Sequence, residues 1–246
     1  MGWRPQLQRI MKLSIIIPTW NEAGRIRLAI QRAWQAGADE VIVADGNSPD
    51  GTAEIAGREE CTVCQGPAGR GGQQHLGACQ ASGEVLLFLH ADSWFPRPVR
   101  HQLAHSMQDK SVVYGVFRQR IEADDLAFRW LERGNAWRAS WLRLPYGDQG
   151  IFVRRSTYDA VGGFDEVPLM EDVMLARKLR RFGAPALLPG PIVTSARRWK
   201  QHGICRQTIR NWCLLAAFQL GVSPARLARY YDRRNRLRPE NVGPPR

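Results

Sequence analysis

The first ninety residues alternate between short apolar runs and segments with helical spacing, and this alternation constrains the fold more than any other feature. Residues 13–17 form an apolar, largely β-branched run, which is typical of a strand buried on both faces. Further strands are expected at 40–44, 62–65 and 85–89, and helices at 21–36, 52–56 and 72–81. Asn21 is expected to cap the first helix and Gly37 to end it. Alternating strands and helices predict a parallel, doubly wound α/β sheet.

The pattern loosens beyond Asp92, where the expected elements are less regular. Helices are expected at 99–107, 124–142 and 172–181, and strands at 112–119, 151–153 and 186–188. Residues 204–231 predict two helices separated at Ser223-Pro224, with Ser223 as the cap and Pro224 in the first turn. We therefore expect one main domain over residues 12–205 and a basic helical extension over residues 206–246.

Composition places the chain among globular proteins, and its charge is concentrated at one end. Its 246 residues are 44% hydrophobic and 24% charged, which excludes wholesale disorder. The net charge is +12, and residues 197–246 hold twelve Lys and Arg against two acids. Such a basic extension is typical of contact with nucleic acid or anionic lipid, or of simple solubility, and the charge alone leaves all three open.

The cysteines and the apolar runs bear on the compartment. Five cysteines, an odd number, do not indicate a disulfide framework, so a reduced, cytoplasmic compartment is expected. The chain has neither a run of about 18 apolar residues nor the apolar core of a secretory signal. The segment 212–222 is apolar but too short to span a bilayer, and arginines flank it. We hypothesise that this extension docks on the anionic inner face of the plasma membrane; the alternative is that the apolar helix packs on the main domain and the arginines are solvated.

Polar groups follow three of the expected strands: PTWNE at 18–22, DGNSPDGT at 45–52 and HAD at 90–92. In open parallel sheets, ligands bind at the carboxyl ends of the strands, so these segments predict a site at one sheet edge. The dinucleotide fingerprint G-x-G-x-x-G and the Walker motif are both absent. A carboxylate after a strand suits a divalent cation that bridges two phosphates. Asp45 is then expected to hold a ribose or base, and Arg70, in a glycine-rich turn, to lie near the phosphates.

Four sequence blocks, in this order along the chain, together resemble a known enzyme family. They are SIIIPTWNE at 14–22, VIVADGNSPDGT at 41–52, GEVLLFLHAD at 83–92, and GGFD at 162–165 followed by MED at 170–172. Over residues 12–205 the chain resembles the family-2 glycosyltransferases with the GT-A fold. The resemblance implies a Rossmann-like, mostly parallel sheet. It also implies an inverting, metal-dependent transfer of a sugar from a nucleoside-diphosphate sugar to an acceptor hydroxyl, with Mg²⁺ or Mn²⁺ as the cation.

The resemblance assigns roles to individual residues at the strand ends. Pro18, Asn21 and Glu22 match the first nucleotide-binding strand end. Asp45 matches the carboxylate that recognises the nucleobase. Residues 90–92 match the metal motif Asp-x-Asp. Asp92 is its last carboxylate, and Ala91 is its middle residue, on the donor side. His90 stands where the family has the first aspartate.

His90 is a departure from the family pattern, because a neutral imidazole contributes no charge. It can still bond a ribose or ligate a softer divalent ion. The other assignments lie in the second half of the chain: Asp172 as the catalytic base beside Glu171, Asp148 and Gln149 in the acceptor-side loop YGDQ, Trp199 on the acceptor side, and His202 as a late metal ligand. Of the motif Gln-x-x-Arg-Trp of processive synthases, the Arg-Trp pair at 198–199 alone is present, which argues against a processive synthase.

Several alternatives remain open from the sequence. A nucleotidyltransferase shares the sheet and the metal, but its glycine-rich signature does not follow the first strand. A nucleic-acid-binding protein would use the basic extension, yet no recognition motif is present and no specific nucleic acid is expected. Residues 90–96 and 220–224 resemble small bacterial members linked with arsenosugar biosynthesis. Trp130, Trp137 and Trp141 share a helix face, which predicts either core packing or a wall for a sugar or lipid-like acceptor.

Overall fold

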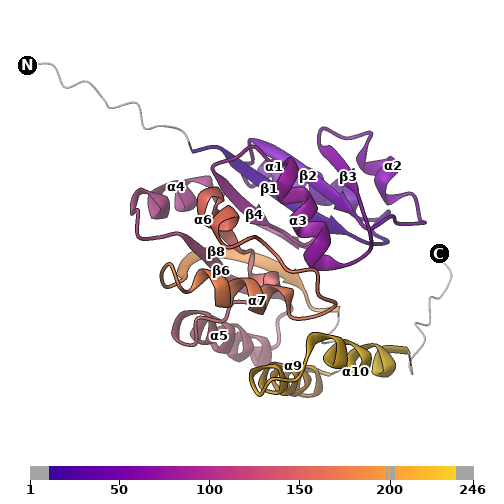
Figure 1. Cartoon of the computed structure of the whole chain (residues 1–246), viewed down its shortest axis with the longest axis vertical. Helices are drawn as coiled ribbons and strands as arrows, with labels where there is room; N and C mark the ends of the chain where they lie inside the picture. Colours follow the sequence, from indigo (N-terminus) through magenta and orange to yellow (C-terminus); the bar gives the residue numbers. More distant parts are fainter. Residues whose placement is uncertain (1–10, 198, 200–202, 237–246) are drawn as a thin grey trace, which may run out of the picture.

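The computed structural model describes residues 11–197, 199 and 203–236. Within these residues, eight strands form one mixed sheet in the order β3-β2-β1-β4-β7-β6-β8-β5 (Figure 1). In chain order the strands are β1 (Leu13–Thr19), β2 (Glu40–Asp45), β3 (Thr62–Gln65), β4 (Val85–Phe88), β5 (Ser93–Trp94), β6 (Tyr114–Glu122), β7 (Phe152–Arg154) and β8 (Ala186–Ser195). The predicted doubly wound α/β architecture is confirmed for β1 to β4, which pair in parallel. β7 runs antiparallel to both of its neighbours and joins the two halves of the sheet.

Helices cover this sheet, and most of them lie close to the predicted positions. In chain order they are α1 (Ile26–Gln35), α2 (Thr52–Ala56), α3 (Arg70–Gln80), α4 (Arg100–Gln108), α5 (Leu126–Trp141), α6 (Arg155–Ala160), α7 (Glu171–Leu179), α9 (Ile204–Gln219) and α10 (Pro224–Arg236), with a 3-10 turn η1 at Gly147–Gln149. As predicted, α10 begins at Pro224, and Gly37 ends α1 with a left-handed φ of 98°.

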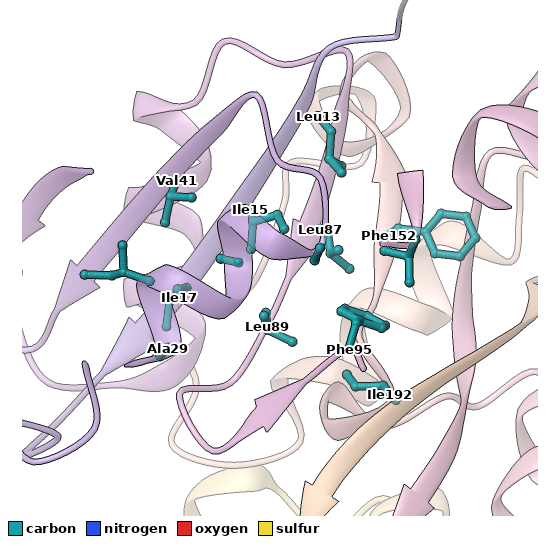
Figure 2. Packing of buried hydrophobic residues seen from close by; sticks show 14 of the residues in the cluster. Leu13, Ile15, Ile17, Ala29, Val41, Leu87, Leu89, Phe95, Phe152 and Ile192 are labelled. Carbon is teal, nitrogen blue, oxygen red and sulfur yellow. The ribbon is translucent and has the colours of Figure 1, made fainter. Parts of the chain in front are cut away.

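The central strand β1 is buried on both faces, as its run of isoleucines predicts. Ile15 and Ile17 belong to the core cluster that contains Ala29 of α1, whereas Ile16 belongs to the cluster that contains Ala78 of α3. Figure 2 shows the first of these clusters, which continues across the sheet to β7 and β8. Because side chains alternate along a strand, one apolar run packs against helices on both sides of the sheet.

The chain that leaves β1 differs from the prediction. Asn21 does not cap α1, because it has a left-handed φ of 56° and the helix begins five residues later at Ile26. The backbone amide of Asn21 donates to Ser48 Oγ at 3.0 Å instead. The loop after β1 is therefore tied to the loop after β2, and both are held at the same edge of the sheet.

The sheet's far edge also differs from the prediction. β8 continues to Ser195 because it pairs in parallel with β6 both before and after residues 189–191, which form an irregularity at a register shift. β5, two residues long, and α6 were not predicted. These elements depend on partners distant in the sequence, and a local pattern does not reveal them.

The C-terminal helices pack on the main body. Leu214, Leu215 and Phe218 of α9 share a buried cluster with Val173 of α7 and Leu144. The predicted boundary between residues 205 and 206 falls inside α9, so the division into two parts stays a prediction. In the described part of the chain, no helix combines the length and apolar character that crossing a membrane requires. All five cysteines lie among the described residues as free thiols.

Candidate active site

Asp45 ends β2 and is fully buried. Its Oδ1 accepts hydrogen bonds from Ser48 Oγ at 2.6 Å and Thr19 Oγ1 at 3.1 Å, and its Oδ2 accepts from the Ser48 amide at 2.8 Å. A buried carboxylate is stabilised by such donors. Asp45 thus fixes the loop after β2 to the end of β1, and its contact with a nucleobase stays a prediction.

Hydroxyl groups connect the first two loops at this edge. Glu22 donates its amide to Thr52 Oγ1 at 2.9 Å, which parallels the bond from Asn21 to Ser48. The Glu22 side chain pairs with Arg25 at 3.2 Å. Pro18 is buried within β1 opposite Ala44 of β2. The predicted donor-side residues of β1 and β2 are therefore brought together in one rigid segment.

Gln73 is a buried residue of α3 that the sequence analysis missed. Its Nε2 donates to the carbonyl oxygens of Thr19 at 2.5 Å and Ala44 at 3.1 Å, at the ends of β1 and β2. The carbonyls at a strand end need a donor when they are buried. Gln73 donates to both, beside the Gly46 amide that also donates to Thr19 at 3.0 Å, and this attaches α3 to the same edge of the sheet.

The glycine-rich turn permits a close approach between α3 and residues 165–171. A β-carbon on Gly71 would lie 2.2 Å from the carbonyl oxygen of Asp165 and 3.2 Å from Glu171 Cβ. The absence of a side chain at Gly71 therefore lets α3 pack directly on residues 165–171. This packing brings Arg70 beside Glu171, with Nη1 and Oε1 3.2 Å apart.

Glu171 is almost completely buried, whereas half of the Arg70 side chain is exposed. Burial raises the pKa of the Glu171 carboxyl, Arg70 opposes this, and neighbouring Asp172 raises it further. Arg70 thus neutralises a buried carboxylate and still presents exposed surface. A contact between Arg70 and phosphate stays a prediction.

Asp172 lies in the first turn of α7, where the helix dipole favours negative charge. Its Oδ2 accepts a hydrogen bond from the Gly147 amide at 2.7 Å, and its Oδ1 accepts from the Val173 amide at 2.7 Å. The carboxylate is therefore held in one orientation by two backbone donors. Gly147 opens η1, in the predicted acceptor-side loop.

His90 comes close to the same glycine from the end of β4. A β-carbon on Gly147 would lie 3.1 Å from His90 Nε2 and 3.6 Å from Asp172 Oδ2. Three segments that are distant in the sequence therefore converge here. The first segment carries His90, which replaces the first aspartate of the metal motif. The second is the acceptor-side loop with Gly147, and the third carries Asp172, the predicted base.

Asp148 adds a third carboxyl to this region. Burial raises its pKa, Gln119 and Arg138 oppose the shift, and the carboxylates of Asp172 and Asp92 raise it further. Oδ2 accepts from Gln119 Nε2 at 2.9 Å, while the buried Oδ1 has no hydrogen-bond partner among the described residues. Asp92 and Asp172 thus both lie close enough to Asp148 to disfavour its charged form.

Arg138 of α5 is a second residue that the sequence analysis missed, and it is 2% exposed. Its guanidinium donates to the Leu144 carbonyl and, at 3.2 Å, to Gln149 Oε1, and it lies 3.4 Å from the centroid of the Tyr146 ring. Gln149 is fully buried, and its Oε1 also accepts from the Tyr146 amide at 3.1 Å. Arg138 and Gln149 therefore hold the loop that presents Gly147, and an acceptor contact of Gln149 stays a prediction.

The remaining predicted residues are distributed around this centre. Ala91 is buried in the core, and Asp92 is exposed beside Ser93. Trp199 packs edge-on against Phe128, with ring centroids 6.2 Å apart. His202 lies outside the described residues. Among the residues that are described, no group of three or more His, Cys, Asp or Glu side chains is arranged to hold a metal ion.

Comparison with protein families gives the decisive result. Residues 14–164, more than half of the chain, match the model described as "Glycosyl transferase family 2". The chain belongs to glycosyl transferase family 2. This family-2 chain is also similar to the probable glycosyltransferase YdaM of Bacillus subtilis (strain 168), with 24% identity over 209 residues. The match covers 74% of this chain and 49% of YdaM, so the chain spans about half the length of that relative.

Solved structures share the fold of this family-2 chain. One is the mannosyltransferase PcManGT from Pyrobaculum calidifontis in complex with GDP-Man and Mn²⁺, with a TM-score of 0.63 and 19% identity over 87% of this chain and 66% of that one. Another is S. aureus TarS 1-349 in complex with UDP-GlcNAc, with a TM-score of 0.57 and 17% identity over 75% and 58% of the two chains. The predicted GT-A fold is thereby confirmed.

Proposed function

We propose that this family-2 chain transfers a sugar from a nucleoside-diphosphate sugar to an acceptor hydroxyl with inversion, and that Asp172 is the general base. One observation carries the proposal. The Asp172 carboxylate is held by the Gly147 amide at 2.7 Å, at the point where His90 and the acceptor-side loop meet. This is the sheet edge at which ligands of open α/β sheets bind.

The proposed chemistry needs a fixed, charged carboxylate. An acceptor hydroxyl is a poor nucleophile, and a positioned base that takes its proton contributes about 10²- to 10⁴-fold in rate. The two amide donors fix the orientation of the Asp172 carboxyl and leave further lone pairs on both oxygens for the hydroxyl. In the transfer, the acceptor oxygen bonds to the anomeric carbon and the bond to the diphosphate breaks. The hydroxyl proton goes to Asp172.

The donor is proposed to bind along the ends of β1, β2 and β4. Pro18, Asn21 and Glu22 would line the nucleoside side with Asp45 and Ala91, and Arg70 would face the diphosphate. Solved structures of similar fold contain GDP-Man and UDP-GlcNAc, which supports a nucleotide-sugar donor. Hydrogen bonds to Ser48 and Thr52 already tie the loops after β1 and β2 together, so a donor would not need to order them.

A divalent cation fits the charge of this region. The carboxylates of Asp92 and Asp172 both raise the pKa of Asp148, and a cation beside them would offset their negative charge. Mg²⁺ commonly binds one or two carboxylates together with substrate phosphates, so Asp92 with His90 could hold it without a complete protein cage. When bound, the cation would stabilise negative charge on the leaving diphosphate. The Mn²⁺ in the PcManGT complex supports this choice, and His202 remains a candidate ligand.

The acceptor side is proposed to include Asp148 and Trp199, with Gln149 behind them. The acceptor itself is not identified by these residues. The first experiment is therefore a screen of GDP-, UDP-, dTDP- and ADP-sugars for slow hydrolysis with Mg²⁺ or Mn²⁺, which needs no acceptor. Nuclear magnetic resonance of the released sugar reports its anomeric configuration, and mass spectrometry identifies products in extracts. Failure to bind or hydrolyse any of these donors would contradict the proposal.

A further inference from the structure

α5 presents an apolar face to solvent. Leu126, Trp130, Trp137 and Trp141 are 77%, 70%, 51% and 77% exposed, and their spacing of four, seven and four residues places them on one side of the helix. Core packing of the three tryptophans, one of the two alternatives that the sequence left open, is excluded. Exposed indoles in a row are unusual on a monomer surface and mark an interaction site.

α9 continues this apolar character. Its inner face packs on α7, but Ile209, Trp212 and Leu220 are 63%, 50% and 87% exposed on its outer face. Ile204 at the start of α9 packs against a cluster that contains Phe128 of α5. Figure 1 shows α5, α9 and α10 along the lower side of the molecule, away from α1 and β1. We call the exposed residues Leu126, Trp130, Trp137, Trp141, Ile209, Trp212 and Leu220 the aromatic surface.

Exposed arginines lie along the aromatic surface, while the exposed acids Glu122, Asp124 and Asp125 are confined to one end of it, just before Leu126. Arg133 is exposed on the same face of α5, with its guanidinium 5.2 Å from the centroid of the Trp130 ring, and the exposed Arg143 follows the helix. Within α5, the one acid, Glu132, is paired with Arg129 at 2.7 Å. Residues 197–231 contain no acid at all, and Arg206 of α9 is exposed.

We propose that the aromatic surface docks this chain on an anionic lipid bilayer. Tryptophan and arginine side chains both suit the boundary between headgroups and acyl chains, where an indole is half buried and a cation meets lipid phosphate. Charge selects this occupant over a second copy of the chain, because a symmetric dimer through this surface would bring two sets of arginines together. The inference goes beyond the proposed transfer. It also differs from the docking hypothesis drawn from the sequence, because the docking element is now α5 together with α9 and not the basic extension alone.

Co-sedimentation with vesicles tests the proposal on the full chain. We expect binding to phosphatidylglycerol-containing vesicles at low salt, weaker binding at high salt, and little binding to pure phosphatidylcholine. The variant W130S/W137S/W141S is expected to lose binding by about tenfold or more, since it removes most of the inserted apolar area. The matched control is Phe182→Ser, which removes an aromatic side chain of 50% exposure outside the surface.

A second variant changes surface charges only, so it tests the proposal even if the tryptophan variant does not fold. Because Arg133 and Arg143 are exposed, R133E/R143E should keep its thermal unfolding midpoint and weaken vesicle binding by at least about fivefold. The proposal is overturned if the wild-type chain does not bind anionic vesicles at low salt, or if the tryptophan variant binds as well as wild type. It is also overturned if sedimentation velocity shows a dimer that this variant dissociates, without vesicle binding. Donor hydrolysis is measured without vesicles, so a failed binding test leaves the proposed transfer untouched.

Discussion

The backbone amide of Gly147 donates a hydrogen bond of 2.7 Å to Oδ2 of Asp172, from a loop 25 residues earlier in the chain. The orientation of the candidate base therefore depends on the position of that loop. Buried Arg138 and Gln149 hold the loop, and His90 lies close to Gly147. A line of contacts thus runs from the buried face of α5 to the carboxylate at the start of α7.

Asp172→Asn is expected to remove transfer and to leave donor binding nearly intact, because a general base acts mainly in the transition state. The asparagine oxygen can keep the bond from Gly147, so the loop should stay in place. Turnover should fall by about 10²-fold or more, with donor affinity from calorimetry within about threefold of wild type. Turnover within about threefold of wild type would remove Asp172 from the role of base.

Asp92→Ala is expected to weaken nucleoside-diphosphate binding and to abolish its response to Mg²⁺ or Mn²⁺. The diphosphate would then lack the cation that offsets its charge. Calorimetric titration of the nucleoside diphosphate, with and without a chelator, measures this directly and needs no turnover. Asp159→Ala on α6, an exposed carboxylate outside the candidate site, is the matched control. Equal affinity of wild-type protein with and without chelator would point to a site that works without a metal.

Arg138→Met is expected to act on the rate rather than on donor affinity. It removes the bonds to the Leu144 carbonyl and to Gln149, so the loop that orients Asp172 should loosen. A misplaced catalytic group costs between about tenfold and a hundredfold in kcat. Losing these bonds lowers the free energy of unfolding, whereas removing a buried charge raises it. The two effects oppose each other, so the net change should be less than about 2 kcal/mol.

Arg138→Lys should restore part of kcat, since an ammonium can donate to one of the two acceptors. Arg133→Met, an exposed change on the same helix, should leave both kcat and donor affinity at wild-type values in a vesicle-free assay. Equal losses in kcat and donor affinity for Arg138→Met would instead indicate general damage to the site.

The sequence was sufficient for the parts of the fold that rest on local patterns. The isoleucines of β1 predicted a strand buried on both faces, and polar residues after β1, β2 and β4 predicted which sheet edge carries the candidate site. The inference about the fold is confirmed because burial leaves a signature within a few residues, whereas the site at this edge stays a prediction.

The parts that the sequence did not predict depend on long-range contacts. Gln73 donates to carbonyls 54 and 29 residues away, and a glutamine in a helix gives no sign of such partners. Arg138 resembles any helical arginine until α5 is placed against the loop that follows it. The proline-containing residues 189–191 suggested the end of a strand, but pairing with β6 carries β8 through them.

The carboxyl of Asp148 should make stability depend on pH. Burial raises its pKa in the folded chain, so above the ordinary carboxyl pKa the folded state holds a proton that the unfolded state has lost. The free energy of unfolding should therefore fall as the pH rises through that window. Asp148→Asn removes this contribution, so its stability relative to wild type should be greater at about pH 8 than at about pH 4.

Denaturant unfolding of both proteins across this pH range measures the difference. Burial raises the pKa of Glu171 too, so the variant should keep part of the slope. A variant whose pH dependence equals that of wild type would show that Asp148 does not hold its proton in the folded chain.

Gly71→Ala is expected to destabilise the fold, whereas Gly72→Ala next to it should not. A β-carbon on Gly71 would meet the Asp165 carbonyl oxygen at 2.2 Å, so α3 and residues 165–171 would have to separate, at a cost of about 1–3 kcal/mol. On Gly72 the nearest atom is Glu166 Cγ at 3.5 Å, an ordinary contact. Alanine is also favoured over glycine in a helix by about 0.5–1 kcal/mol, so Gly72→Ala should be neutral or stabilising.

Urea unfolding of the two variants gives the comparison. Equal midpoints would show that α3 does not need the glycine to pack against residues 165–171. If the midpoints differ as expected, donor hydrolysis should fall in Gly71→Ala alone, because the separation moves Arg70 away from Glu171.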